Sequence, residues 1–318
     1  MIYLTIIIPH YNAVQPLELL LVSIPFTEQV EIIIVDDRSD INELEHLQRI
    51  ISNSKHQNIH LLKNNTKHKG AGICRNIGIE NAKGQWLLFA DADDYFIEGF
   101  FDTISVYFKS ENDVIFFSPT SIDIQSQLQS DRHLIYQKRI SDYLEKADEI
   151  SLILLKYSFK VPWSKLIRTS FLREYKIYFD EVLASNDVMF STKVGYHMRA
   201  FEASREEIYC VTERSGTLTK NTSKEVFACR RDVYIAYCNY LKERLPKHEL
   251  TILDLHGRYI LSNALLYRIG LMETLVTFFK LRRNKIKVFD LWLLNPRKVS
   301  KRILEKLKAH NKNKKFLQ

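Results

Sequence analysis

The first 120 residues alternate between short apolar runs and stretches with helical spacing, and this alternation limits the possible folds more than any other feature of the chain. Apolar runs rich in β-branched residues predict strands, and a 3.6-residue spacing predicts the helices between them. The predicted strands are 4–8, 31–35, 59–62, 86–90 and 114–117, and the predicted helices are 17–24, 41–51, 71–82 and 99–108. The pattern is typical of an α/β fold with a mainly parallel central sheet flanked by helices.

Beyond residue 120 the alternation stops, and helical spacing returns at 187–198 and 227–245. Neither an internal repeat nor a low-complexity linker separates the two halves, so we expect the second half to pack onto the sheet. The expected division is 1–120, 121–225 and 226–318, the last of these being a helical C-terminal extension with a basic, amphipathic tail.

The charge is unevenly distributed. The whole chain carries +8, but from Lys280 onward fourteen Lys and Arg face only Asp290 and Glu305, which gives +12 and leaves −4 for residues 1–279. Apolar residues at 288–294 and an amphipathic stretch at 299–307 lie among these cations. The tail is therefore predicted to lie on an anionic membrane surface, with a solvated charged tail as the alternative.

The opening residues have the pattern of a strand, with no basic leader or cleavage site, so we expect a cytoplasmic protein. From the basic tail we also expect peripheral attachment to the cytoplasmic leaflet. The longest apolar stretch, 259–279, contains Arg268 and Glu273, which argues against a transmembrane helix. The four Cys lie far apart, which argues against a zinc site and a disulfide framework.

Acidic residues follow two of the predicted strands, at the edge where ligands of parallel sheets bind. Asp91 and Asp93, one residue apart, predict a divalent cation that also binds phosphate oxygens, although a turn that tolerates Asp is the alternative. One carboxylate of the pair Asp36 and Asp37 is predicted to accept hydrogen bonds from a base or ribose, and Tyr11 to stack on a ring. The alternative for Asp37, or for Ser39, is to cap the helix beginning near residue 41.

Gly70, Gly72 and Arg75 open a predicted helix in a pattern that superficially matches a dinucleotide-binding fingerprint. The match fails because Arg75 occupies the place of the third glycine. A cation at a helix start suits diphosphate binding better than close helix–strand packing. A simple tight turn remains the default interpretation of the two glycines.

Four blocks, at 5–12, 31–37, 70–76 and 86–94, resemble the successive blocks of glycosyltransferase family 2, with its GT-A nucleotide-sugar fold. The resemblance covers residues 3–120 well and continues more loosely through 163–166 and 185–190 to 215–219, where it is similar to bacterial capsular, exopolysaccharide or cell-surface glycan assembly members. It implies a metal-dependent, inverting transfer of a sugar from a nucleoside-diphosphate sugar, with UDP favoured, to a hydroxyl of a glycan or lipid-linked acceptor. Residues 1–120 would be the nucleotide-sugar-binding half and 121–225 the acceptor-side half.

The resemblance also assigns residues, with Asp93 as ligand of Mn²⁺ or Mg²⁺. The implied donor-binding residues are Pro9, Tyr11, Asn12, Asp37, Gly70, Arg75, Asp91 and Ala92. His10 and Cys74 depart from the family pattern, which more often has a small or aliphatic residue there. Asn186 and Asp187 stand in place of a common Glu-Asp pair.

Inversion requires a carboxylate on the acceptor side to take the hydroxyl proton, and Asp187 is predicted to be this base. The alternative is that Ser185, Asn186 or Asp187 only caps the following helix. Trp163, Lys165 and Asn186 are predicted to line the acceptor site, with a place in the core as the alternative for Trp163.

Three other functions fit the sequence less well. A sugar nucleotidyltransferase would carry a Gly-rich, basic loop after its first strand, where this chain has 9–12. A phosphatase with an Asp nucleophile leaves Tyr11, Asp37 and Arg75 unexplained. Nucleic-acid binding through the tail is not expected, because the other 279 residues are net acidic and show no recognition module. The sequence does not specify the oligomeric state.

Overall fold

The computed structural model describes residues 1–213 and 222–288. By their internal contacts the residues form two compact units, which divide between Leu253 and Asp254. The family-like segment 215–219 and the part of the basic tail from residue 289 onward, which holds nine of its fourteen Lys and Arg, lie outside the described residues. Among the described helices, none combines the length and the apolar character needed to cross a membrane.

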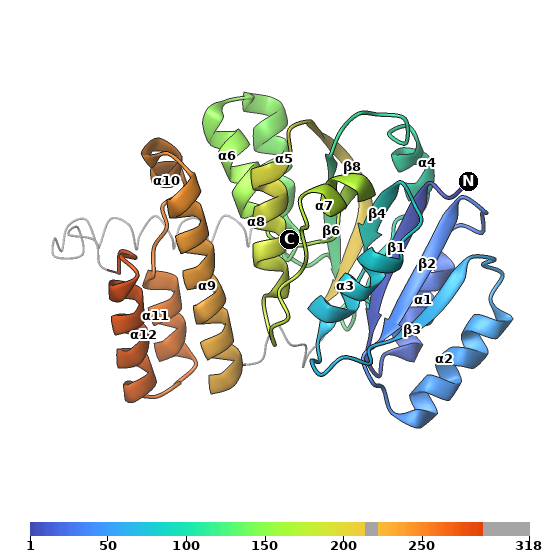
Figure 1. Ribbon diagram of the computed structural model, residues 1–318, viewed down its shortest axis with the longest axis horizontal. Coiled ribbons are helices and arrows are strands. Elements are labelled where there is room, and N and C mark those ends of the chain that lie inside the picture. Colours follow the sequence, from blue (N-terminus) through green and yellow to red (C-terminus); the bar gives the residue numbers. More distant parts are fainter. Residues whose placement is uncertain (214–221, 289–318) are drawn as a thin grey trace. The chain divides into compact units, whose positions relative to one another are not determined.

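The first unit is built on one sheet of eight strands in the order β3-β2-β1-β4-β7-β6-β8-β5 (Figure 1). The strands are β1 (Leu4–His10), β2 (Val30–Asp36), β3 (Ile59–Lys63), β4 (Trp86–Phe89), β5 (Tyr95–Phe96), β6 (Val114–Asp123), β7 (Lys165–Arg168) and β8 (Phe201–Glu213). Strands β1 to β4 are parallel neighbours. The predicted mainly parallel sheet is confirmed, and each of the five predicted strands is present.

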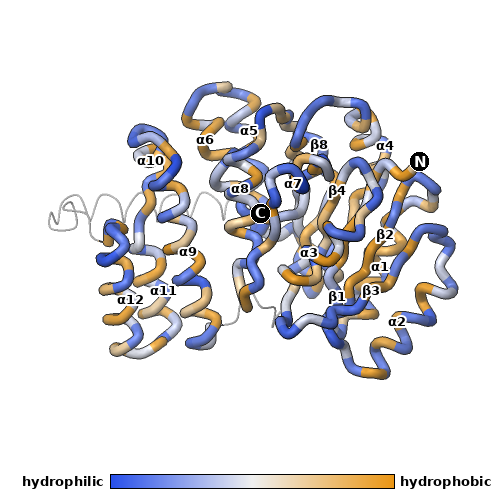
Figure 2. The backbone as a smooth tube through the Cα atoms, in the orientation of Figure 1, coloured by the Kyte–Doolittle hydropathy of each residue, from blue (hydrophilic) through white to orange (hydrophobic). Residues whose placement is uncertain are grey.

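Apolar runs rather than alternating patterns form these strands because both faces of the sheet are covered. Hydrophobic residues recur along β1, β2 and β4 (Figure 2). Ile6 and Ile8 of β1 belong to one hydrophobic cluster, and Ile7 between them belongs to the other. The two clusters form the core on the two sides of the sheet.

The helices of the first unit supply the other half of each cluster, with Leu17 of α1 and Leu47 of α2 in the first, and Ile79 of α3 and Phe190 of α8 in the second. These helices are α1 (Val14–Ser23), α2 (Ile41–Asn53), α3 (Ala71–Asn81), α4 (Phe100–Ser105), α5 (Leu134–Lys146), α6 (Glu149–Ser158), α7 (Thr169–Glu174), α8 (Asn186–His197), α9 (Lys224–Arg244) and α10 (Lys247–Leu253). The predicted helices at 187–198 and 227–245 are thus confirmed as α8 and α9.

Three strands were not predicted from the sequence, namely β5, β7 and β8. Strand β7 is antiparallel to both β4 and β6, whereas β8 is parallel to β6 and antiparallel to β5. Two register shifts, around Ser118, interrupt the pairing of β6 with β8. Strand β8 matters for the site, because its C-terminal half is hydrogen-bonded to the loop that follows β4.

The second unit contains two described helices, α11 (Arg258–Leu266) and α12 (Leu271–Arg283). They pack closely at Gly257, where a Cβ would lie 2.8 Å from a methyl carbon of Leu281. Gly270 starts α12 with φ of +107°, a conformation that favours glycine.

Candidate active site

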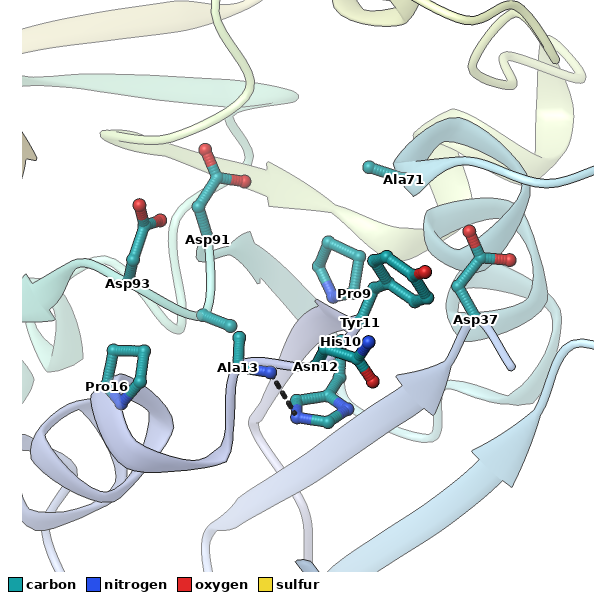
Figure 3. Close-up of a pocket in the computed structure, with 11 residues that line it drawn as sticks. Pro9, His10, Tyr11, Asn12, Ala13, Pro16, Asp37, Ala71, Asp91 and Asp93 are labelled. Atoms are coloured by element: carbon teal, nitrogen blue, oxygen red, sulfur yellow. Dashed lines mark hydrogen bonds between the residues drawn. The ribbon is translucent and has the colours of Figure 1, made fainter. Parts of the chain in front are cut away.

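The carboxyl ends of β1, β2 and β4 surround a pocket of about 510 Å³ (Figure 3). Seven residues that the sequence predicted to bind donor or metal line it. The full lining consists of Pro9, His10, Tyr11, Asn12, Ala13, Pro16, Asp37, Ala71, Asp91, Ala92 and Asp93. The structure therefore brings together residues more than 80 positions apart in the chain at the edge where parallel sheets bind ligands.

Asp37 connects the end of β2 to the start of α3. Its Oδ1 accepts a hydrogen bond of 2.6 Å from Asn64 Nδ2, and its Oδ2 accepts one of 2.7 Å from the backbone N–H of Gly70. Gly70 does not line the pocket but has φ of +128°, which favours glycine. Helix α2 begins at Ile41 without a side-chain cap, so Asp37 has no capping role there.

The turn after β1 is held by a buried histidine. His10 Nδ1 lies 3.2 Å from Asp36 Oδ1, and His10 Nε2 accepts a hydrogen bond of 3.3 Å from the backbone N–H of Ala13 (Figure 3). Because Nε2 accepts a hydrogen bond, it carries no proton in the neutral ring. The ring proton is therefore on Nδ1, where it is directed at Asp36. His10 and Cys74, the two departures from the family pattern, are both buried, and His10 also lines the pocket.

Tyr11 and Asn12 form the exposed rim of the pocket. Tyr11 is 54% exposed, and this exposure leaves a flat aromatic surface at the pocket. Lys69 Nζ lies 4.8 Å from the centre of the Tyr11 ring. Asn12 exchanges two hydrogen bonds with Asp40, one of 2.9 Å through its amide nitrogen and one of 2.8 Å through its oxygen. Asn12 therefore ties the turn after β1 to the turn after β2.

The acidic loop, defined here as residues 91–94, directs its carboxylates two ways. Asp91 and Asp93 lie side by side at the pocket (Figure 3), whereas Asp94 is buried. Asp94 accepts hydrogen bonds of 2.8 Å from the Tyr209 hydroxyl and 2.7 Å from the backbone N–H of Thr212. Burial raises the pKa of Asp94 well above its ordinary value, and the charges of Asp91 and Asp93 raise that pKa further.

Tyr209 of β8 is the anchor of the acidic loop, because its hydroxyl also accepts a 2.8 Å hydrogen bond from the backbone N–H of Asp91. We expect Tyr209→Phe to lower the free energy of unfolding by about 1–3 kcal/mol, since it leaves a buried acceptor and a backbone donor unpaired. Urea unfolding measures the change. The matched control is Tyr107→Phe, because the Tyr107 hydroxyl makes no hydrogen bond to any residue that the structure describes. Equal effects of the two changes would contradict the anchoring role.

Arg75 links the acidic loop to α8 and does not line the pocket. The guanidinium, 5% exposed, forms an ion pair with Asp91 and donates a 2.8 Å hydrogen bond to Asn186 Oδ1. Its Nε is buried without a hydrogen-bond partner among the described residues. A Cβ at Gly72 would lie 2.4 Å from the carbonyl oxygen of Asp180, so this glycine permits the close approach of α3 to the segment before α8.

Asp187 is the second residue of α8 and is half-buried. Ser185, the residue before the helix, makes no side-chain hydrogen bond to the first turn, so capping by Ser185 is not realised, whereas the Asp187 carboxylate accepts a hydrogen bond from its own backbone N–H. Burial raises the pKa of Asp187 above its ordinary value, and the positive charge of Arg75 opposes that rise. The carboxylate thus lies within electrostatic reach of both Arg75 and Asp91.

Trp163 and Lys165 lie in the interior. The Trp163 ring, 4% exposed, stacks on Tyr209 at 6.0 Å between ring centres, which is the core position that the sequence left open. Lys165 is 1% exposed, and its Nζ donates a 2.6 Å hydrogen bond to the carbonyl oxygen of Phe159. Burial lowers the pKa of Lys165 to about 7. Two of the three predicted acceptor residues thus contact residues that hold the acidic loop, Trp163 by stacking on Tyr209 and Asn186 by a hydrogen bond with Arg75.

The two carboxylates of Asp91 and Asp93 fit a divalent cation of the Mg²⁺ or Mn²⁺ type. Both are hard oxygen donors and both line the pocket. Within the described residues, no group of three or more His, Cys, Asp or Glu could hold a metal by itself. The remaining ligands would be phosphate oxygens and water, as Mg²⁺ sites with one or two carboxylates commonly have.

A profile described as "Glycosyl transferase family 2" matches residues 5–176, which include every residue that lines the pocket. The chain belongs to glycosyl transferase family 2. The profile ends before α8, so the family match itself does not include Asn186 or Asp187.

Two curated relatives within this transferase family act on poly(ribitol-phosphate) according to their names. Poly(ribitol-phosphate) beta-N-acetylglucosaminyltransferase TarS of Staphylococcus aureus is 26% identical over 224 residues, which are 68% of this chain and 36% of TarS. Poly(ribitol-phosphate) beta-glucosyltransferase of Bacillus spizizenii is 28% identical over 227 residues, which are 67% of this chain and 33% of the relative. The chain thus spans about a third of the length of these relatives.

Solved structures of two transferases share the fold. The crystal structure of S. aureus TarS 1-349 superposes with a TM-score of 0.62 and 20% identity, covering 86% of this chain and 77% of the other. The same protein in complex with UDP-GlcNAc superposes with a TM-score of 0.58 and 22% identity, covering 83% of this chain and 72% of the other. Mannosyltransferase PcManGT from Pyrobaculum calidifontis, in complex with GDP-Man and Mn²⁺, superposes with a TM-score of 0.54 and 13% identity, covering 89% of this chain and 81% of the other. The GT-A fold expected from the sequence is confirmed.

Proposed function

We propose that the chain is a metal-dependent, inverting glycosyltransferase that moves a sugar from a UDP-sugar to a hydroxyl of a cell-surface glycan or a lipid-linked acceptor. The observation that carries the proposal is the single pocket in which Tyr11, Asp37, Asp91 and Asp93 meet from three strand ends. The names of TarS and of the Bacillus enzyme support a phosphate-containing surface glycan as the acceptor. Residues 1–120 would form the donor half of the site and 121–225 the acceptor half.

Each proposed role follows from a contact. Tyr11 presents the flat surface on which a uracil ring would stack, and Asp37 is fixed by two hydrogen bonds next to it. Asp91 and Asp93 would hold Mn²⁺ or Mg²⁺, which when bound stabilises the charge that develops on the diphosphate leaving group. Arg75 keeps Asp91 in place, and its positive charge beside Asp91 would stabilise the diphosphate without lining the pocket.

On the acceptor side, Asp187 would accept the proton of the attacking hydroxyl. Its place in the first turn of α8, beside Asn186, puts it next to the Arg75 guanidinium and through it near the donor pocket. Burial keeps the carboxylate basic, as a general base requires. Trp163 and Lys165 would support this side from the interior rather than contact the acceptor.

The proposal includes attachment to the cytoplasmic leaflet through the basic tail, where a lipid-linked acceptor would be reached. The tail from residue 289 adds nine Lys and Arg against two acidic residues. Each basic residue near an anionic membrane contributes about 1 kcal/mol to binding.

A panel of nucleotide sugars tests the donor. We expect a UDP-sugar with Mn²⁺ to raise the unfolding temperature and to be hydrolysed slowly to UDP, since a ligand at 100 times its Kd stabilises a protein by about 2.7 kcal/mol. GDP-sugars, at the same concentrations, are the control. Pyrophosphate formation from a nucleoside triphosphate and a sugar phosphate would instead identify a sugar nucleotidyltransferase and overturn the proposal.

A further inference from the structure

Helix α12 exposes the apolar side of its surface. Its exposed residues include Met272, Leu275, Val276 and Phe279, which follow the i, i+3, i+4, i+7 spacing of one helix face. These side chains are 76%, 44%, 38% and 64% exposed. In an ordinary amphipathic helix a stripe with this spacing faces the core. Here the stripe is exposed, and the buried residues of the helix are Thr277 and Leu281.

Helix α11 and the turn that joins it to α12 add to the same kind of surface. We use the term outer face for the exposed apolar residues of this helix pair, which are Tyr259, Leu265, Leu266, Leu271, Met272, Leu275, Val276 and Phe279. Single exposed apolar residues are common, but eight within 21 residues form a concentration that usually marks an interaction surface.

The charge around the outer face indicates the partner. Residues 254–288 contain seven Lys or Arg and two acidic residues, a net charge of +5. Arg268 lies in the turn between the two helices, and Arg282 and Arg283 end α12, all three being exposed. A second copy that docked through this face would bring two surfaces of +5 together, which is unfavourable. An anionic surface with an apolar interior satisfies both the charge and the hydrophobicity.

We propose that the outer face of α11 and α12 binds an anionic lipid bilayer, with its apolar side chains in the interface and its arginines at the headgroups. Helices that lie in the membrane plane have this combination of an apolar face and basic residues. The inference does not depend on sugar transfer, because the assay that tests it contains no nucleotide sugar.

Cosedimentation of the full chain with vesicles tests the proposal. We expect binding to vesicles of phosphatidylcholine with phosphatidylglycerol, and weak binding to phosphatidylcholine alone. Met272→Glu combined with Phe279→Glu should weaken the binding by at least about tenfold, because two apolar side chains leave the interface. The matched control, Leu19→Glu with Val22→Glu on α1, changes the net charge equally at residues that are 62% and 76% exposed.

A second measurement uses a variant that keeps the apolar character. Phe279→Trp should gain emission that shifts to the blue with anionic vesicles and is quenched by brominated lipid. Equal binding of the Met272/Phe279 variant and the wild type would overturn the proposal and assign membrane binding to the tail. Sedimentation velocity that shows a dimer dissolved by the same variant, with vesicle binding unchanged, would also overturn it in favour of a second copy.

Discussion

Asp187→Asn is expected to leave donor binding intact and to lower turnover by about 10²–10⁴, the usual contribution of a general base. Asparagine has nearly the same shape but cannot take a proton from the acceptor hydroxyl. Asparagine keeps a side-chain oxygen that can accept the hydrogen bond that the Asp187 carboxylate receives from its own backbone N–H, so the replacement should affect stability little. Steady-state release of UDP, together with donor titration by thermal shift, separates the two effects.

The matched control for this variant is Asp148→Asn at the start of α6. Asp148 is also a carboxylate at a helix N-terminus, where it accepts a 2.7 Å hydrogen bond from the backbone N–H of Ser151. Both substitutions remove one negative charge from the start of a helix, but only Asp187 is near the pocket. Unchanged turnover of Asp187→Asn, with normal donor binding, would show that the base lies elsewhere.

The same assignment sets the pH dependence of turnover. A general base works in its ionised form, so the rate falls as pH decreases through the pKa of Asp187. Since burial raises that pKa, the acid limb of kcat should lie at higher pH than for an exposed aspartate. In Asp187→Asn the residual rate should lack this limb, which a pH–rate profile of both proteins would detect.

Asp93→Asn is expected to lower turnover by about 10²–10³, the loss typical when one group that stabilises developing charge is removed. The Asp93 carboxylate lines the pocket beside Asp91, whereas Asp94 faces the interior. The amide of asparagine is a weaker ligand for a hard cation, so more Mn²⁺ should be needed for donor-dependent stabilisation. Titration of Mn²⁺ at fixed UDP-sugar, followed by thermal unfolding, measures this shift.

Asp102→Asn serves as the control for the metal prediction, because Asp102 is an exposed carboxylate in the first turn of α4 and does not line the pocket. It should leave the Mn²⁺ titration unchanged. A titration of Asp93→Asn that coincides with that of the wild type would remove Asp93 from the metal site.

Local sequence was sufficient to predict the parallel half of the sheet. Buried strands such as β1 and β2 are continuous apolar runs, and the residues that follow them necessarily share one edge. For this reason Tyr11, Asp37, Asp91 and Asp93 could be placed in one pocket before any coordinates were known. The prediction needed only the positions of the parallel strands along the chain and not their packing.

The contacts that organise the pocket could not be predicted in this way, since they join segments far apart in the chain. Tyr209 and Asp94 are 115 residues apart, and Arg75 and Asn186 are 111 apart. Strand β8 has a polar N-terminal half that gives no strand pattern, so its hydroxyl anchor had no signal in the sequence. Trp163 was ambiguous because an aromatic residue suits a core and a sugar-binding surface equally.

The position of Arg75 between Asp91 and Asn186 has a consequence for how the two sides of the proposed active site are coupled. A single guanidinium serves a carboxylate on one side and the start of α8 on the other. A cation that neutralises Asp91 competes with that guanidinium, and thermodynamic linkage requires the effect to be reciprocal. In the proposed function, a cation bound at Asp91 and an acceptor bound near Asn186 would therefore each change the affinity of the other by the same factor.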